Sequence, residues 1–441
     1  MTHYNHPSVI TGFLNTVSSS LKTAPSSLKT ISSSLKAAPS SLKTVVGALL
    51  VMAGSLMAVT ATAASHSGHA RTTISTSLQH LAERMMRGKQ GSIVAIDPAT
   101  GEIKCMVSAS PRGDSSQRAV SVPYSPGSTF KVAQAIAMLS EGTLSPTAQY
   151  SCARGFTQGG IHIGCHAHTS PRAVVGALGT SCNAFFCKSF MDMIGSAKYR
   201  TRAEAIDRWH AYMSSFGLGR RLGTDVGPEA PGLMPSADYL KRIHGQWAPQ
   251  TIMWVGMGQG EVTATPMQLC NLAAVIANRG YYYTPHLCRA TPGHPIDSAY
   301  RRKHVAMGTP QAYQITIQGM RAAVVSGTCA SINRAAYAIC GKTGTAENEG
   351  EDHSLFIGFA PMDKPRIAVA VVVDNGGFGA DMAAPIASLI IEQYLTGRLR
   401  EYSEYQVEQW ASQTVMPYTP PADTAKAVKA PASKQQKTQH K

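Results

Sequence analysis

The sequence predicts a mixed α/β fold of the α+β type, in which an antiparallel sheet built from both ends of a domain is flanked by helices and joined to an all-helical lobe. Two observations carry this prediction. Residues 92–97 and 102–108 read as strands around a turn at 98–101, and residues 354–360 and 366–374 form a second strand pair. The long segment between the two pairs is mostly helical in pattern, so a cleft is expected between the sheet edge and the helical lobe.

Apolar residues at helical spacing give the expected helices. Ile74, Leu78, Leu81 and Met85 share one helical face just before the first strand pair, and residues 383–395 form a helix after the second pair. The helices of the middle segment are predicted over 129–139, 171–178, 184–194, 202–215 and 266–278.

The two ends of the chain carry most of its basic charge. The net charge of the 441 residues is +15, of which residues 1–88 hold +6 and residues 421–441 hold +4, so the middle carries +5. No basic stripe is interleaved with aromatic residues, so no nucleic-acid partner is expected. A serine-rich seven-residue repeat near the N-terminus is interrupted by prolines, which favours a disordered tail over a coiled coil.

Residues 45–64 are twenty residues without a charge, which is long enough to span a bilayer. Lysines precede this stretch and no acid occurs before Glu83, so the N-terminus is expected in the cytoplasm and the rest outside the inner membrane, as a single-pass protein. A cleaved signal peptide is the alternative, because Ala61-Thr62-Ala63 fits a small-residue cleavage site. The expected organisation is a cytoplasmic tail at 1–44, an anchor at 45–64, a linker and helix at 65–88, one large domain at 89–412 and a disordered tail at 413–441.

Nine cysteines are an odd number, so at least one is unpaired in an oxidising compartment. Cys152 and Cys165 bracket a loop rich in glycine and histidine and are a candidate disulfide pair. Cys329 and Cys340 are a second candidate pair. The loop at 152–168 also offers imidazoles for zinc, from His162, His166 and His168. A disulfide or free thiols are favoured over a metal, and no metal or cofactor is expected.

The first candidate site lies in the segment 126–131 (PGSTFK), at the start of a helical pattern. Residues three apart on a helix share one face, so the Lys131 amine can reach the Ser128 hydroxyl. A serine becomes a nucleophile when a base takes its proton, and a buried lysine with a lowered pKa can be that base. Taken alone, this pattern is common, and an exposed helix surface is its ordinary explanation.

A second candidate site is the triplet Ser181-Cys182-Asn183, which lies between two helical patterns. A hydroxyl and a carboxamide two positions apart can face one pocket, where one relays a proton and the other holds a substrate amide. The ordinary explanation of such a triplet is a helix cap.

The third candidate site is Lys342-Thr343-Gly344-Thr345, which follows an apolar run and precedes an acidic loop. On a strand edge, Lys342 and Thr343 can bind a substrate carboxylate, and Gly344 lets a substrate backbone approach closely. An ordinary turn explains most such tetrapeptides.

In this order and after an export segment, the three motifs match the pattern of penicillin-binding proteins and class A β-lactamases, with Cys182 in place of the aspartate of the second motif. The chain from about 91 to 395 resembles class B penicillin-binding proteins, especially the cell-elongation type called penicillin-binding protein 2. The stretches that carry the resemblance are 91–108, 124–131, 179–186, 258–280, 338–347 and 356–373.

The resemblance implies a serine β-lactamase/transpeptidase-like fold and a peptidoglycan D,D-transpeptidase that β-lactams inhibit covalently. It implies that Ser128 attacks the penultimate D-alanyl carbonyl of a stem peptide and that Lys131 is the base. The other implied roles are proton relay and substrate orientation by Ser181 and Asn183, carboxylate binding by Lys342, Thr343 and Thr345, close approach at Gly344, and an oxyanion hole from the backbone N–H groups of Ser128 and Thr345.

The expected partners are peptidoglycan stem peptides, β-lactam antibiotics, the cytoplasmic membrane and a SEDS-family glycosyltransferase. Class B members usually carry a long pedestal between anchor and catalytic domain, and only residues 65–88 are available for one here. This departure leaves the catalytic resemblance intact and weakens the expectation of partner contacts through a pedestal.

Two alternatives stay open. A D,D-carboxypeptidase or β-lactamase-like hydrolase would pass the acyl group to water, although no Glu-x-x-Leu-Asn element of a class A β-lactamase occurs between Asn183 and Lys342. A β-lactam sensor or an idle scaffold would bind without turnover, although all three motifs are intact and residues 1–43 show no pattern of a globular effector.

Overall fold

The structure is a computed structural model that describes residues 72–113, 116–170, 172–291, 295–348 and 350–416. Within these ranges, every helix is too short or too polar to cross a membrane. The predicted anchor at 45–64 and the tail at 1–44 lie outside the described residues, as does most of the tail at 413–441.

A five-stranded antiparallel sheet forms the centre of the described chain, with the strand order β2-β1-β9-β8-β7. The strands are β1 (Gly91–Ile96), β2 (Ile103–Ala109), β7 (Cys340–Ala346), β8 (His353–Ala360) and β9 (Ile367–Val373). Both predicted strand pairs are therefore confirmed. The pairing of β1 with β9 joins the two ends of the domain, which confirms the predicted fold class.

The inner strands β1, β8 and β9 are buried on both faces, and this burial explains why their sequences are mostly apolar. Every residue of β1 and of β9 is buried. In β9 the alternate residues Ala368, Ala370 and Val372 face one hydrophobic core, and Val369 and Val371 face a second one.

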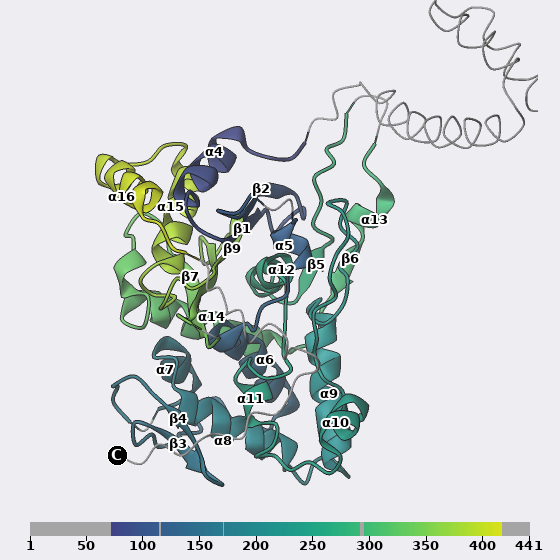
Figure 1. The fold of residues 1–441 in the computed structure, drawn as a ribbon. Coiled ribbons are helices and arrows are strands. Elements are labelled where there is room, and N and C mark those ends of the chain that lie inside the picture. The colour runs from purple at the N-terminus through teal and green to yellow at the C-terminus, as the bar shows by residue number, and fades with distance from the viewer. Residues whose placement is uncertain (1–71, 114–115, 171, 292–294, 349, 417–441) are drawn as a thin grey trace, which may run out of the picture. The chain divides into compact units, whose positions relative to one another are not determined.

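Helices cover the two faces of the sheet (Figure 1). Helix α12 (Pro266–Ala277) packs on β1, β8 and β9 from one side, and all its residues are buried. Helix α15 (Ala383–Thr396) packs on β8 and β9 from the other side, and α4 (Thr76–Met85) packs there on β2. The predicted helices at 266–278, at 383–395 and before the first strand pair are thus confirmed.

The two ends of the domain are fastened to each other. Helix α16 (Glu401–Ser412) packs against α4, and Arg84 forms an ion pair with Glu408. The buried Lys89 amine donates hydrogen bonds to the carbonyl oxygens of Trp410 and, at 2.6 Å, Gln413. Helix α4, expected in a linker segment, therefore packs as part of the compact unit.

The helical lobe is built from the middle of the chain and lies below the sheet in Figure 1. Its helices are α6 (Lys131–Glu141), α7 (Val174–Gly179), α8 (Asn183–Ile194), α9 (Arg202–Ser215), α10 (Ala237–His244), α11 (Met253–Gly256) and α14 (Pro310–Val325). The first four confirm predicted helices. Helices α10, α11 and α14 were not among the predictions. The shorter elements are β3 (Gly155–Gln158), β4 (Ile161–Gly164), β5 (Tyr281–Tyr283), β6 (Lys303–Val305), α5 (Arg118–Ser121), α13 (Ser298–Arg301) and η3 (Ala330–Ile332).

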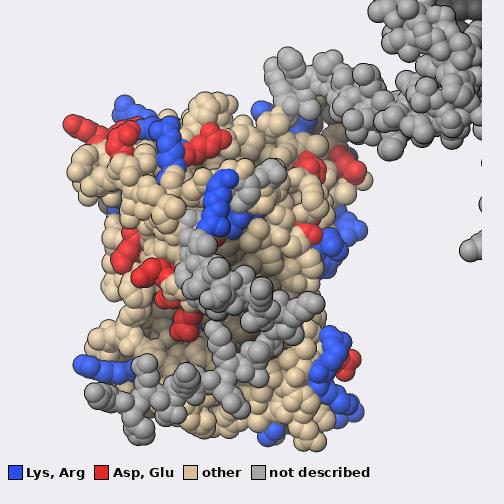
Figure 2. All heavy atoms as spheres, in the orientation of Figure 1, with Lys and Arg blue, Asp and Glu red and all other residues tan. Residues whose placement is uncertain are grey.

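A buried carboxylate joins two helices of the lobe. Glu141, at the end of α6, accepts hydrogen bonds from Lys198, Tyr199, Arg208 and Tyr212. These donors outweigh the cost of burial and lower the pKa of Glu141 to about 2. Elsewhere, charges of both signs are spread among uncharged residues on the face shown in Figure 2.

Candidate active site

Ser128 lies in a short 3₁₀ helix, η2 (Gly127–Phe130), which leads directly into α6. In a 3₁₀ turn, side chains three residues apart eclipse each other, so Lys131 stands directly over Ser128. The Lys131 Nζ atom lies 3.0 Å from the Ser128 hydroxyl oxygen. The predicted pairing of these two side chains is therefore present, in a tighter turn than the α-helix that the sequence suggested.

The Lys131 side chain is fully buried and points into a ring of oxygen atoms. Its Nζ lies 2.9 Å from the carbonyl oxygen of Ser181 and also contacts the side-chain oxygen of Asn183. Burial lowers the pKa of Lys131 to about 8. A neutral amine here can donate its two hydrogens to Ser181 and Asn183, and its lone pair then faces the Ser128 hydroxyl.

Ser181 lies in the turn between α7 and α8 and has a left-handed backbone, with a φ of 56°. This conformation is uncommon for a residue other than glycine, and such strain tends to occur at functional sites. The turn directs the Ser181 carbonyl at Lys131, and its hydroxyl lies 2.9 Å from the Lys342 Nζ atom. Burial, and then the charge of Lys131, lowers the pKa of Lys342 well below its usual range.

Strand β7, which carries the third motif, is the edge strand of the sheet and packs against η2. Alternation along the strand puts Thr343 and Thr345 on one face and Lys342 and Gly344 on the other. A Cβ atom at Gly344 would lie 2.7 Å from Thr129 Cγ2. The glycine therefore has a packing reason as well, because it lets η2 approach the strand.

The structure brings together the three segments that the sequence singled out. Lys131 contacts Ser128, Ser181 and Asn183, and Lys342 reaches the same Ser181 hydroxyl. One contact was not expected from the sequence. The hydroxyl of Thr328, in the turn after α14, lies 2.9 Å from that of Thr343.

Helix α8 begins at the triplet, and sulfur atoms accept its first backbone N–H groups. Cys182 is the N-cap and its Sγ accepts from Phe185 at 3.4 Å. Cys165 directly follows β4. Its Sγ atom accepts hydrogen bonds from the backbone N–H groups of Asn183, at 3.1 Å, and Ala184, at 3.4 Å. The Asn183 amide also donates to the Gly164 carbonyl at 2.6 Å.

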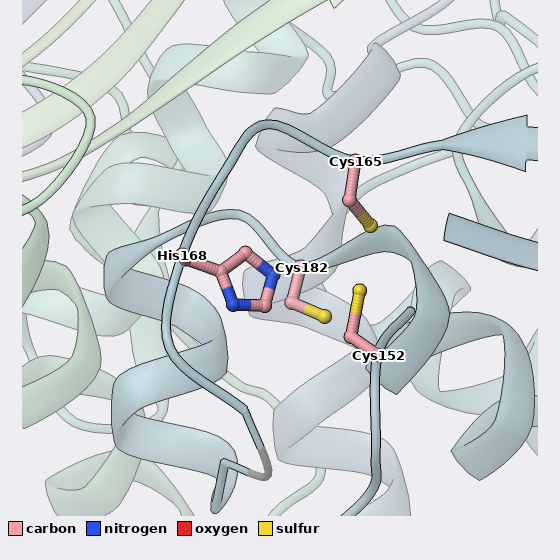
Figure 3. Close-up of side chains that lie close together, drawn as sticks. All are labelled: Cys152, Cys165, His168 and Cys182. Carbon is pink, nitrogen blue, oxygen red and sulfur yellow. The ribbon is translucent and has the colours of Figure 1, made fainter. Parts of the chain in front are cut away.

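Four potential metal ligands meet at this helix start, as Figure 3 shows: Cys152, Cys165, His168 and Cys182. Their ligand atoms all lie within 4.8 Å of one another. Around a tetrahedral zinc ion, sulfur ligands stand about 3.8 Å apart, so small inward shifts would suffice. A hydrogen bond from the Cys182 thiol and two from backbone N–H groups lower the pKa of the Cys165 thiol.

The imidazole of His168 has the tautomer that zinc ligation requires. Its Nδ1 lies 2.8 Å from the Thr169 carbonyl oxygen, so Nδ1 is the donor, and in the neutral ring the lone pair is then on Nε2. Nε2 is buried, and among the described residues it has no hydrogen-bond partner. Three thiols and this nitrogen therefore fit a closed structural zinc site.

The cysteine pairings expected from the sequence are not formed in the structure. All nine cysteines, which lie within the described ranges, are free thiols. Cys152 and Cys165 are close to each other but share their neighbourhood with Cys182 and His168, which the sequence pattern did not connect. Cys329 and Cys340 are buried, and burial raises the pKa of each thiol to about 12.

Comparison with known families agrees with this geometry. The family model described as penicillin binding protein transpeptidase domain matches residues 91–392, which is more than half of the chain. The chain belongs to this family. The resemblance to penicillin-binding protein 2 inferred from the motifs is thereby confirmed.

Named relatives and solved structures of this penicillin-binding family are similar to the chain. Peptidoglycan D,D-transpeptidase MrdA of Acinetobacter baumannii is 32% identical over 372 residues, which cover 73% of this chain and 53% of that protein. The PbpA transpeptidase of Mycobacterium tuberculosis is 28% identical over 389 residues, covering 75% of this chain and 73% of that protein. The crystal structure of Pseudomonas aeruginosa PBP2 in complex with WCK 5153 has a TM-score of 0.66 and 30% identity, and covers 75% of this chain and 77% of that one. The chain spans about half the length of the MrdA relatives.

Proposed function

We propose that the protein is a peptidoglycan D,D-transpeptidase, which forms cell-wall peptide cross-links through an acyl-enzyme at Ser128. The observation that carries the proposal is the 3.0 Å contact between the Ser128 hydroxyl and the buried Lys131 amine, whose pKa is lowered to about 8. The relatives named above bear the name of this activity. The proposed catalytic residues are Ser128, Lys131, Ser181, Asn183 and Lys342.

Acylation begins with proton transfer from Ser128 to the neutral Lys131 amine as the serine oxygen attacks the D-alanyl carbonyl. The new C–O bond forms, and the C–N bond to the terminal D-alanine breaks. The leaving amine needs a proton, which Lys131 can return through the Ser181 hydroxyl, because that hydroxyl lies 3.2 Å from Lys131. Lys342, 2.9 Å from the same hydroxyl, orients it for this transfer.

Substrate binding is assigned to the open edge of β7. An extended stem peptide can add to an edge strand through backbone hydrogen bonds. Its terminal carboxylate would be held by the hydroxyls of Thr343 and Thr345 and by the charge of Lys342. Gly344 has no side chain, so the substrate backbone can approach the strand closely at this residue. The backbone N–H groups of Ser128 and Thr345 would stabilise the oxyanion.

The same acyl-enzyme explains β-lactam inhibition. When the serine opens the lactam ring, the released amine stays joined to the acyl group, so no leaving group departs from the site. The structure of penicillin-binding protein A from M. tuberculosis as a ceftriaxone acyl-enzyme complex shares the fold, with a TM-score of 0.59 and 26% identity over 74% of this chain. An amine of a second stem peptide is the proposed acceptor of the physiological acyl group. Transfer to water would instead give a D,D-carboxypeptidase or a hydrolase of β-lactams.

The proposed setting is the inner membrane, with residues 45–64 as anchor and the transpeptidase domain at 89–412 on the outer side. The uncharged twenty-residue stretch and the lysines before it support this arrangement. A SEDS-family glycosyltransferase is the proposed partner. A structure described as a peptidoglycan synthase complex that coordinates polymerization and crosslinking is 28% identical, with a TM-score of 0.63.

The decisive experiment labels the full chain with fluorescent penicillin and compares it with Ser128→Ala. We expect a labelled band at about 46.8 kDa that lasts many minutes in the wild type and is absent from the variant. Ser189→Ala is a matched control, because this buried serine of α8 lies outside the motifs. Release of label within seconds would identify a hydrolase, and growth rescue by Ser128→Ala in a depletion strain would identify a scaffold.

A further inference from the structure

Three thiols adjoin the catalytic residues closely enough to act on them. Cys182 is the central residue of the triplet that holds Ser181 and Asn183. Cys165 accepts the backbone N–H of Asn183, and the residue before it, Gly164, accepts the Asn183 side-chain amide. The start of α8 is therefore held in place by a sulfur atom and a carbonyl from the end of β4.

This contact continues to the nucleophile through a short chain of hydrogen bonds. The oxygen of the Asn183 side chain accepts from the Lys131 amine, and that amine contacts the Ser128 hydroxyl. Any displacement of Cys165 therefore shifts Asn183 and, through it, Lys131. The base that activates the serine is positioned in part by a residue that can be oxidised.

Two of the three thiols are accessible and one is not. Cys152 and Cys165 are partly exposed, whereas Cys182 is buried. In Figure 3 their sulfur atoms point toward one another, Cys165 from the end of β4 and Cys152 from the loop before β3. The ligand atoms of this cluster all lie within 4.8 Å of one another, so a small movement can bring the Cys152 and Cys165 sulfur atoms into bonding distance.

We propose that Cys152 and Cys165 form a redox switch that slows acylation of Ser128 when the two thiols are oxidised to a disulfide. The proposal rests on the proposed function of Ser128, because its readout is the acylation of that serine. The reduced thiols hold the catalytic geometry, either by hydrogen bonds alone or as ligands of a bound metal ion. Oxidation also removes two of the four potential ligands, so a bound ion would be released.

The chemistry needs an oxidant of the hydroperoxide class, such as hydrogen peroxide. The Cys165 thiolate attacks one peroxide oxygen, the O–O bond breaks, and the products are a sulfenic acid and one water after protonation. The Cys152 thiolate then attacks the sulfenic sulfur, the S–S bond forms, and the S–O bond breaks to give a second water. Two thiols lose two protons and two electrons in total, and one peroxide is reduced to two waters.

The disulfide weakens the hold on Asn183 for two reasons. The two sulfur atoms must come within about 2.05 Å of each other, and this movement changes the contacts of Cys165 with the Asn183 and Ala184 N–H groups. A sulfur atom bonded to Cys152 also has its position fixed by the S–S bond, so it can no longer follow the Asn183 and Ala184 N–H groups. A displacement of about 1 Å near a catalytic group can cost on the order of a hundredfold in rate. We expect peroxide to lower the acylation rate constant by about ten- to a hundredfold.

The test uses the full purified chain, as isolated, before and after treatment with hydrogen peroxide. Free thiols are counted, the peptide cross-link between Cys152 and Cys165 is sought by mass spectrometry, and the rate constant of fluorescent-penicillin acylation is measured. We expect the cross-link, the loss of rate, and recovery of both after dithiothreitol. In Cys152→Ser, which keeps the sulfur that Asn183 contacts, the ratio of treated to untreated rate should stay near one.

The controls separate this switch from general damage and from failure of the proposed function. Cys288→Ser removes an exposed thiol outside the site and should respond to peroxide like the wild type. Cys165→Ser, checked for folding by circular dichroism, should have lost the reversible response as well. A cross-link that leaves the rate unchanged, or an equal loss of rate in Cys152→Ser, overturns the switch. Untreated protein without label at Ser128 overturns the proposed function instead.

Discussion

The Lys342 amine lies 2.9 Å from the Ser181 hydroxyl oxygen, which is the same oxygen that Lys131 approaches to 3.2 Å. Both amines are fully buried. Two positive charges on either side of one hydroxyl repel each other strongly in a medium of low dielectric constant. The arrangement is therefore most stable with one amine neutral, which supports the proposed role of Lys131 as the base next to Ser128.

The first prediction concerns the pH dependence of acylation. Burial lowers the pKa of Lys131 to about 8. Only the neutral amine accepts the Ser128 proton, so the second-order rate constant for fluorescent penicillin should rise with pH and level off above about 8. Lys131→Arg keeps its charge throughout this range and should show no measurable acylation. A rate that stays constant between about pH 6 and pH 10 in folded protein would contradict this assignment.

The second prediction concerns the Thr328 hydroxyl, which contacts the Thr343 hydroxyl. Thr328→Val removes the partner that lies 2.9 Å from the Thr343 hydroxyl, so the group that we propose binds the carboxylate loses its fixed orientation. We expect acylation by penicillin to slow about three- to tenfold, with a loss of stability of about 1 kcal/mol. Thr143→Val is the matched control, since it loses a similar bond to the Met138 carbonyl at the far end of α6. An equal effect on acylation in both variants would refute the role of Thr328.

The third prediction concerns metal content. Three thiols and the Nε2 atom of His168 fit zinc, so protein purified without chelator should hold about one zinc ion per chain by elemental analysis. Removal by a strong chelator should lower the melting temperature, because the ion fastens β4 to the start of α8. His168→Ala should bind zinc at least about tenfold more weakly, whereas His162→Ala should not. Metal-free protein with an unchanged melting temperature would show that the site is held by hydrogen bonds alone.

The fourth prediction concerns the carboxylate that joins α6 to α9. The donors around Glu141 hold its folded pKa at about 2, below the ordinary value of 4.5, so its stabilisation is complete above about pH 4.5 and is lost as the pH falls toward 2. Glu141→Gln should lower the free energy of unfolding by urea by about 2 kcal/mol at pH 7, with a smaller difference at pH 3. The exposed Glu401→Gln should change it by less than about 0.5 kcal/mol at either pH.

Local chemistry explains why so much of the candidate site could be predicted. Ser128 and Lys131 interact within one turn, and Ser181 and Asn183 within one helix start, so their spacing in the sequence already carries their geometry. The apolar runs of β8 and β9 are buried on both faces, which makes them recognisable without knowledge of their partners. The meeting of the three motifs, by contrast, was supplied by the family resemblance.

The unpredicted parts depend on contacts between segments far apart in the chain. Helix α14 contains Gly319, which costs about 1 kcal/mol of helix stability relative to alanine and hides the helix from propensity arguments. A Cβ atom there would lie 2.4 Å from Leu178, so packing against α7 requires the glycine. The turn that follows α14 brings the Thr328 hydroxyl into contact with the Thr343 hydroxyl. The sequence also could not show that Cys182 lies beside Cys152 and Cys165. That proximity depends on tertiary structure, because it requires β4 to pack against the start of α8.

The pairing of β1 with β9 also governs how this protein can be made. Residues 91–96 find their partner only at 367–373, so the central sheet cannot close while the ribosome is still synthesising the helical lobe. Until then, the apolar faces of the β1–β2 pair remain exposed to water and to other chains. This exposure makes a nascent chain prone to aggregation. A stop codon or proteolytic cut before β9 should therefore yield an insoluble fragment rather than a smaller working enzyme.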